Sequence, residues 1–137
     1  MVGAAGFGEE IALTLTARTA TLTNSLRLRM QGARGILAVV HVKSVTTGTG
    51  RLSVSGIEPF AGNAFGINAA TTFAAPGDYV YMIHPGAAKQ PSGEAAATSH
   101  ANLFMHVGIV VPELFLLSLV KSDASSWEYG VSFRRLR

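Results

Sequence analysis

Four histidines are the first residues in this chain that could do chemistry: His41, His84, His100 and His106. A catalytic or structural zinc site usually places ligands at short spacings such as H-x-H or H-x-x-x-H. No such spacing occurs here, and the chain has no cysteine to supply a thiolate. His41 and His106 lie inside apolar runs, where a strand histidine with one satisfied hydrogen bond is the simpler interpretation. We therefore predict no metal site and no cofactor.

A nucleophile could come from the adjacent pair Ser99 and His100, with Asp78 elsewhere in the chain as a third member. The surrounding sequence is a soft loop without the G-x-S-x-G turn that exposes a catalytic serine. Neighbours in a loop seldom form a nucleophile–base pair. We predict no catalytic residue from this arrangement.

Two further patterns also have a simple structural explanation. Glu9 and Glu10 are neighbouring carboxylates, but they lie beside the N-terminus, and the chain has only eight acids in all. Gly48-Thr49-Gly50 looks like part of a phosphate loop, yet it lacks the G-K-[ST] ending and precedes a strand pattern. We interpret residues 48–50 as a turn and predict that the protein is not an enzyme.

The cations are the better candidates for a functional surface. Three interpretations stay open for them: a solvated strand face, a contact with another protein, and binding of single-stranded nucleic acid. We rank nucleic acid last of the three, because its binding would need interleaved aromatic residues, and the nearby Trp127, Tyr129 and Phe133 alternate as core residues do. The predicted partner-contact residues are Arg27, Arg29, Arg34, Lys89, Arg134 and Arg135.

The elements that must position these residues are strands. Alternation with a period of two and β-branched or aromatic residues recurs every ~8–12 residues, which is typical of an all-β sandwich or barrel. We predict about eight or nine short strands in a single antiparallel β-sandwich, with a jelly roll as one form of it. The run ILAVVHVKS at residues 36–44 reads as a central strand buried on both faces. The predicted strands lie within residues 10–24, 26–30, 36–44, 51–57, 64–69, 79–84, 103–111, 114–121 and 127–133.

The expected core draws on most of these strands. Its predicted members are Ile36, Val39, Val40, Val42, Leu52, Val54, Val80, Met82, Leu114, Leu116, Leu119, Trp127, Tyr129 and Val131. We expect residues 1–9 to form a flexible arm and residues 10–137 to form one domain, with a long loop at residues 85–102. A hairpin turn is predicted at residues 56–62 from Pro59 and Gly62.

Composition limits the classes of function. The 137 residues are 48% hydrophobic and only 14% charged, which excludes intrinsic disorder. So few charges also suggest a surface that a partner covers. The formal net charge of +3 is too small for a nucleic-acid-binding signature. We predict no membrane segment, because residues 103–120 are interrupted by Pro112 and Glu113, and the N-terminus lacks a cationic leader.

The order of the motifs resembles a known family. Five motifs follow one another along the chain. They are RTAT, GARG before an apolar strand, a G-x-x-P-x-x-G turn, an aromatic strand ending in HPG, and a final S-x-x-Y-x-V strand. The matching positions are residues 18–21 and 32–35, Gly56, Pro59, Gly62, Pro85, Gly86, Ser126, Tyr129 and Val131. This sequence resembles the small all-β head structural proteins of tailed bacteriophages, including capsid decoration proteins.

The resemblance implies a structural virion protein without enzyme activity. The expected function is capsid decoration, in which the chain binds and stabilises the phage head shell. The resemblance also implies that the partner is the major capsid protein, and that the chain is made in the host cytoplasm and assembled into the head. We also expect a homo-oligomer, with a trimer favoured, because repeated contacts on a symmetric shell reinforce one another. Two alternatives stay open: a head–tail joining or tail protein, and a ligand- or carbohydrate-binding β-sandwich module.

Overall fold

All regular structure in the described part of the chain is β-strand. The computed structural model describes residues 8–67, 72–85, 103–106 and 111–137. The predicted arm and long loop lie almost entirely outside these residues, as does Lys89. The strands are β1 (Glu10–Arg18), β2 (Leu22–Asn24), β3 (Leu28–Arg29), β4 (Gly35–Val45), β5 (Gly50–Ile57), β6 (Ala64–Gly66), β7 (Gly77–Ile83), β8 (Leu103–His106), β9 (Leu114–Lys121) and β10 (Trp127–Leu136).

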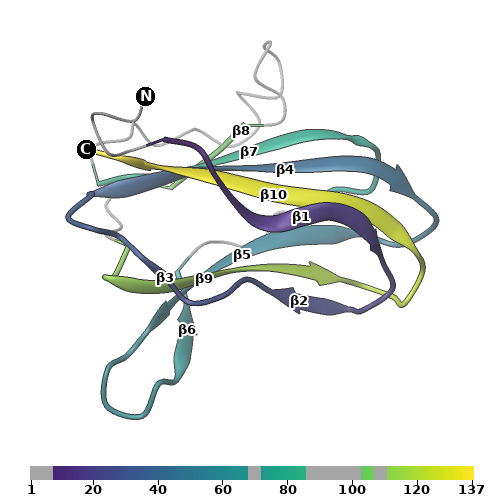
Figure 1. Ribbon diagram of the computed structural model, residues 1–137. Helices are drawn as coiled ribbons and strands as arrows, with labels where there is room; N and C mark the ends of the chain where they lie inside the picture. The colour runs from purple at the N-terminus through teal and green to yellow at the C-terminus, as the bar shows by residue number, and fades with distance from the viewer. Residues whose placement is uncertain (1–7, 68–71, 86–102, 107–110) are drawn as a thin grey trace.

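These strands form two facing sheets (Figure 1). The first sheet has the order β1-β10-β4-β7-β8, and the second has the order β2-β9-β5-β6, with β3 also paired to β9. The predicted all-β sandwich is therefore confirmed. One pairing departs from the antiparallel pattern, because β8 runs parallel to β7. Parallel neighbours need a long crossover, and the segment between Ile83 and Leu103 is long enough to supply one.

The connectivity is that of a jelly roll. Four antiparallel strand pairs, β1–β10, β2–β9, β4–β7 and β5–β6, form one long ribbon that runs inward from both ends of the chain. Successive pairs lie in alternate sheets, so the ribbon wraps around a single core. Consequently β1 and β10 form the open end of the ribbon, and the β5–β6 hairpin forms its closed end.

Strand β10 follows the sequence prediction closely. It lies between β1 and β4, and its residues Trp127, Tyr129, Val131 and Phe133 are all buried. Phe133 meets Phe115 of the second sheet edge to face, with ring centroids 5.9 Å apart. The inward face of β10 thus contributes four buried residues to the first sheet's side of the core.

Strand β4 is the middle strand of the first sheet, but the prediction that both of its faces are buried is wrong. Ile36, Ala38, Val40 and Val42 face the second sheet and are buried. On the other face the strand changes along its length: Leu37 and Val39 are half-buried, and His41 and Lys43 are exposed. The second sheet covers only the inner face, so the apolar run does not imply a covered outer face.

Nine of the predicted core residues are buried, and five are not. Val39, Val80, Met82, Leu114 and Leu116 are half-buried on the outer faces. In apolar runs such as YVYMI and LFLLSLV, both alternating sets are hydrophobic, so the pattern does not say which set points inward. The structure turns the other set inward, namely Tyr79, Tyr81, Ile83, Phe115 and Leu117.

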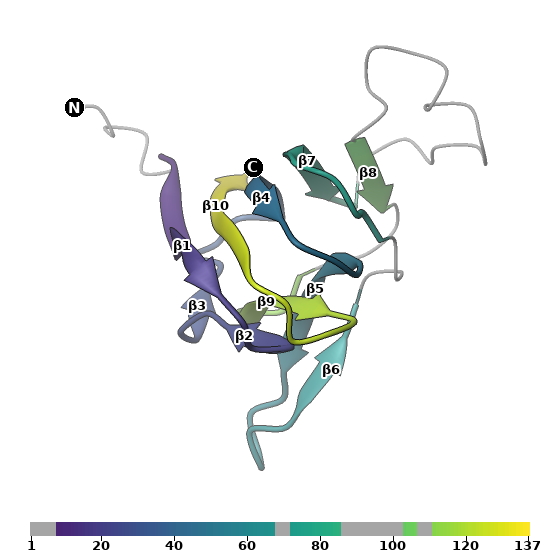
Figure 2. The same cartoon turned by 90° about the vertical axis from the view of Figure 1, so that its right-hand side faces the viewer.

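The predicted hairpin at residues 56–62 is present between β5 and β6. Figures 1 and 2 show this hairpin extending beyond the body formed by the two sheets. The register Ser55↔Gly66 to Ile57↔Ala64 holds its two arms together. The closed end of the ribbon is therefore the most prominent described feature outside the sandwich.

Candidate interaction surface

The histidine candidates do not form a metal centre in the described part of the chain. His41 on β4 lies opposite Asp78 on β7, and His41 Nδ1 is hydrogen-bonded to Asp78 Oδ1 on the open outer face. No group of three potential ligands occurs among the described residues. Ser99 and His100 lie outside them. The pair is a cross-strand contact, and nothing around it supplies a third ligand within the described residues.

The two neighbouring carboxylates, Glu9 and Glu10, contact two different arginines of β10. Arg134 Nε lies 3.9 Å from Glu9 Oε1, and Arg135 Nη1 donates to Glu10 Oε2. Each acid is thus directed to its own cation. They hold the start of β1 against the end of β10.

Gly48 and Thr49 lie in the turn between β4 and β5, which packs against the turn at residues 122–126, and Gly50 is the first residue of β5. Thr49 N donates to Ser122 Oγ over 2.8 Å, and Thr47 Oγ1 donates to Asp123 Oδ2 over 2.8 Å. Gly48 has φ +85°, and a Cβ there would come within 2.7 Å of Asp123 Oδ2. Thr49 N thus serves the contact between the two turns, and Gly50 N donates to the carbonyl oxygen of Phe73 over 2.8 Å, so both of these donors are used within the chain.

Arg135 is one of the predicted partner-contact residues, and the structure places it inside the sandwich. Its side chain is only 3% exposed. Its Nε donates to the carbonyl oxygen of Arg29 over 2.7 Å, and its guanidinium lies 5.1 Å from the centre of the Phe133 ring. Burial lowers the pKa of Arg135. Arg135 therefore links β10 to β3 and β1, and it does not belong to the exposed surface.

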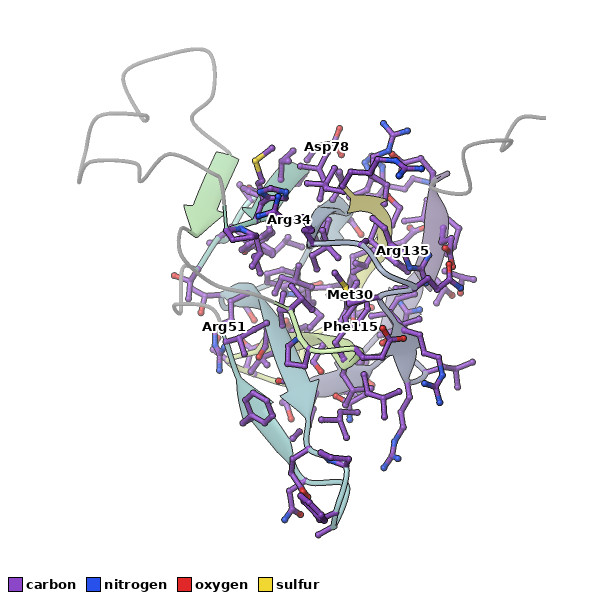
Figure 3. All side chains as sticks on the ribbon, turned by 90° about the vertical axis from the view of Figure 1, so that its left-hand side faces the viewer. Met30, Arg34, Arg51, Asp78, Phe115 and Arg135 are labelled. Carbon is purple, nitrogen blue, oxygen red and sulfur yellow. The ribbon has the colours of Figure 1, made fainter. Side chains whose placement is uncertain are left out.

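The other predicted arginines are exposed but do not form one patch. Arg27 lies beside the β5–β6 hairpin, where its Nη2 would be 3.2 Å from a Cβ at Gly62. Arg34 N donates to the carbonyl oxygen of Leu136, at the end of β10. Figure 3 shows Arg34 and Arg135 to either side of Met30. Arg27 thus belongs with the hairpin, whereas Arg34 belongs with the ends of β4 and β10.

Sequence reasoning missed two further cations that stabilise the fold. Lys121 is buried, and its Nζ donates to the carbonyl oxygens of Arg18 and Ser125. Arg18 in turn donates to the carbonyl oxygen of Tyr129 over 2.9 Å and lies over its ring. Both residues end a strand of alternating pattern, but the sequence does not show which carbonyl groups they reach.

The exposed apolar side chains show a clearer concentration. Of the six large hydrophobic residues exposed in the described part of the chain, four lie between residues 11 and 26. We call this surface, formed by β1, β2, β3 and their connections, the N-terminal flank. Strand β1 is the edge of the first sheet, β2 is the edge of the second, and Figure 2 shows β1, β2 and β3 along the same side of the sandwich. The four residues are Ile11, Leu15, Leu22 and Leu26.

Comparisons with known proteins do not add a family. The chain matches no protein-family model and no curated protein sequence. Among the described residues there is no helix with the length and hydropathy needed to cross a membrane. The function is therefore inferred from the fold and from the surfaces described above.

Proposed function

We propose that this chain is a structural virion protein, a capsid decoration protein that binds and stabilises the head shell of a tailed phage. The observation that carries the proposal is the N-terminal flank, an apolar edge on a sandwich with few charges. Large exposed apolar patches mark protein-contact sites in soluble domains. The jelly-roll connectivity is compatible with this function, since viral capsid domains use it, but lectins use it too.

The flank is suited to a contact with another protein because two of its strands, β1 and β2, are sheet edges. Between Glu10 and Arg18, strand β1 has no charged residue, and those two end residues bind groups of the same chain. Lysine or proline would protect such an edge, and β1 contains neither. Two register shifts in β1 interrupt its pairing with β10, which restricts a partner to short stretches of the edge.

The energies favour a repeated contact. Burying one leucine or isoleucine side chain fully contributes roughly 1.5–3 kcal/mol. Four such residues give a gross gain of the same order as the ~4–15 kcal/mol that association costs. A single flank therefore binds weakly, whereas a homo-oligomer, a trimer being favoured, binds a symmetric shell through several flanks at once. The major capsid protein is the proposed partner, reached after synthesis in the host cytoplasm.

The aromatic residues favour this function over the carbohydrate-binding alternative. Sugar-binding modules present exposed aromatic rings, most often of tryptophan or tyrosine. Here the single tryptophan and all three tyrosines are buried in the core. These residues are Trp127, Tyr79, Tyr81 and Tyr129.

Co-sedimentation tests the proposal. Purified protein is mixed with shells assembled from the major capsid protein encoded in the same genome. We expect the wild-type chain to sediment with the shells, and the double variant Leu22→Ser/Leu26→Ser to bind more weakly. The matched control is Lys43→Ala, an exposed change on the outer face of the first sheet, which should bind like the wild type. A wild-type chain that stays in the supernatant at all concentrations would overturn the proposal.

A further inference from the structure

The tip of the β5–β6 hairpin presents one aromatic ring to solvent. Phe60 is 97% exposed, more than any other large hydrophobic residue of the described chain. The hairpin extends beyond the body formed by the two sheets, so the loop between β5 and β6, which carries Phe60, lies away from the core (Figures 1 and 2). At this exposure the Phe60 ring buries almost no surface within its own chain, so nearly all of its apolar surface is available to a binding partner.

The loop at residues 58–63, here called the hairpin tip, is held in one conformation by Glu58. The carboxylate of Glu58 accepts hydrogen bonds from the backbone N–H groups of Phe60 and Ala61, each over 2.8 Å, and of Asn63 over 2.9 Å. Its backbone N–H donates to the carbonyl oxygen of Asn63 over 3.0 Å. These hydrogen bonds lower the pKa of Glu58. The charge of Glu58 therefore serves the loop itself and holds the backbone on both sides of Phe60 in place.

The base of the hairpin is braced as well. The absence of a side chain at Gly56 makes room for the Phe65 ring and for Pro112, whose atoms would lie 2.5 and 2.6 Å from a Cβ there. Gly62 adopts φ +76°, and the guanidinium of Arg27 lies next to it. The hairpin tip thus has a fixed backbone, an exposed ring and a cation beside it.

We propose that Phe60 is an anchor that inserts into an apolar pocket on the capsid shell, and that a carboxylate on the rim of this pocket faces Arg27. The inference rests on the proposed function and names its principal contact. Aromatic residues that enter pockets dominate binding energies at protein interfaces. A loop ordered before binding avoids the entropy loss that weakens flexible contacts. The occupant is a protein surface because one ring offers a membrane only a marginal anchor, as a single lipid chain does.

The test compares three variants in shell co-sedimentation titrations. Phe60→Ala removes the ring and should raise the dissociation constant by about tenfold or more, as loss of a central interface residue does. Glu58→Ala keeps the ring but frees the loop, and we expect a smaller rise. Ala61→Ser is the matched control on the same loop and should bind like the wild type. Phe60 is almost fully exposed, so its removal should leave the thermal midpoint unchanged, which excludes misfolding as the cause.

The outcomes separate the two proposals. If the wild-type chain binds shells and Phe60→Ala binds equally well, the anchor is overturned while the decoration function stands. If the wild-type chain does not bind shells, both are overturned. Two further measurements complete the test. Light scattering after size exclusion measures self-association, and flotation with anionic phosphatidylglycerol vesicles measures membrane binding. Loss of self-association, or loss of vesicle binding, in Phe60→Ala would assign the tip to a second copy or to a membrane and overturn the shell contact.

Discussion

Arg135 and Glu10 join the two strands, β10 and β1, that form the open end of the jelly-roll ribbon. The guanidinium of Arg135, almost wholly buried near the end of β10, donates to the carboxylate of Glu10 at the start of β1. The same arginine binds the carbonyl oxygen of Arg29 on β3, which belongs to the second sheet. One side chain therefore holds together both sheets at the open end of the ribbon. At the closed end, Glu58 instead holds the hairpin tip by accepting hydrogen bonds from backbone N–H groups of its own loop.

Arg135→Ala should destabilise the fold. The variant removes a buried cation, its hydrogen bonds and its contact with the Phe133 ring. Removing one partner of a buried pair costs up to ~3–5 kcal/mol, and the half-exposed Glu10 places the expected loss near about 3 kcal/mol. Urea denaturation measures it. Arg134→Ala is the matched control, since its contact with Glu9 is exposed and should be worth about 0.5 kcal/mol or less. Equal losses in both variants would contradict the role of Arg135.

Gly50→Ala should disturb the tryptophan. A Cβ at Gly50 would lie 2.8 and 3.0 Å from atoms of the buried Trp127 ring, so the ring must move. Overpacking of this kind costs roughly 1–3 kcal/mol. Because Trp127 is the single tryptophan, its fluorescence reports both the local change and the unfolding midpoint. At Gly66 a Cβ meets nothing within 4 Å, so Gly66→Ala should leave emission and stability nearly unchanged. A Gly50→Ala protein with wild-type emission and midpoint would refute the expected clash.

The same contacts show what the sequence could and could not predict. The alternation of Trp127, Tyr129, Val131 and Phe133 correctly predicts an inward face, and continuing it by one step places Arg135 inside as well. That signal was available, although a charged residue in the core is unusual. Phe60 had a signal too, because it lies in a turn with Pro59 and Gly62 and outside any alternating pattern.

Other features need the three-dimensional pairing. In β7 and β9 both alternating sets are apolar, so only the register with β4 and β5 decides that Tyr81 and Leu117 point inward. The exposure of Leu22 and Leu26 depends on β2 and β3 both pairing with β9 at the sheet edge. Long-range pairing of this kind is invisible to local periodicity.

Asp123 should make the fold sensitive to acid. Hydrogen bonds from Ser125 and Thr47 hold the pKa of Asp123 below its ordinary value of 3.8. A carboxyl group whose pKa is lower in the folded state adds stability above its unfolded value, and this stability is lost as the pH falls through the folded pKa. We therefore expect the urea midpoint to fall below about pH 4 in the wild type, and to fall less in Asp123→Ala. Identical pH profiles would show that these hydrogen bonds add no stability. Glu58, whose pKa is also lowered, contributes to the remaining slope in both proteins.

Removing the hydroxyl group from each of two buried tyrosines should change the stability of the protein in opposite directions. Tyr129 Oη is buried and has no hydrogen-bond partner among the described residues, whereas Tyr81 Oη accepts from the backbone N–H of Leu52 over 3.4 Å. Burial raises the pKa of Tyr81 to about 12, so the Tyr81 hydroxyl is neutral at ordinary pH. An unsatisfied buried hydroxyl costs ~1–3 kcal/mol, while a satisfied one contributes ~0.5–1.5 kcal/mol.

Tyr129→Phe should consequently stabilise the protein by about 1 kcal/mol, and Tyr81→Phe should destabilise it by a similar amount. The two variants remove the same atom from the same core, so each controls for the other in a urea titration. The ring of Tyr129 stays in place under Arg18 in the first variant, and the stacking of that cation is preserved. A loss of stability in Tyr129→Phe equal to that in Tyr81→Phe would show that the Tyr129 hydroxyl is satisfied in solution.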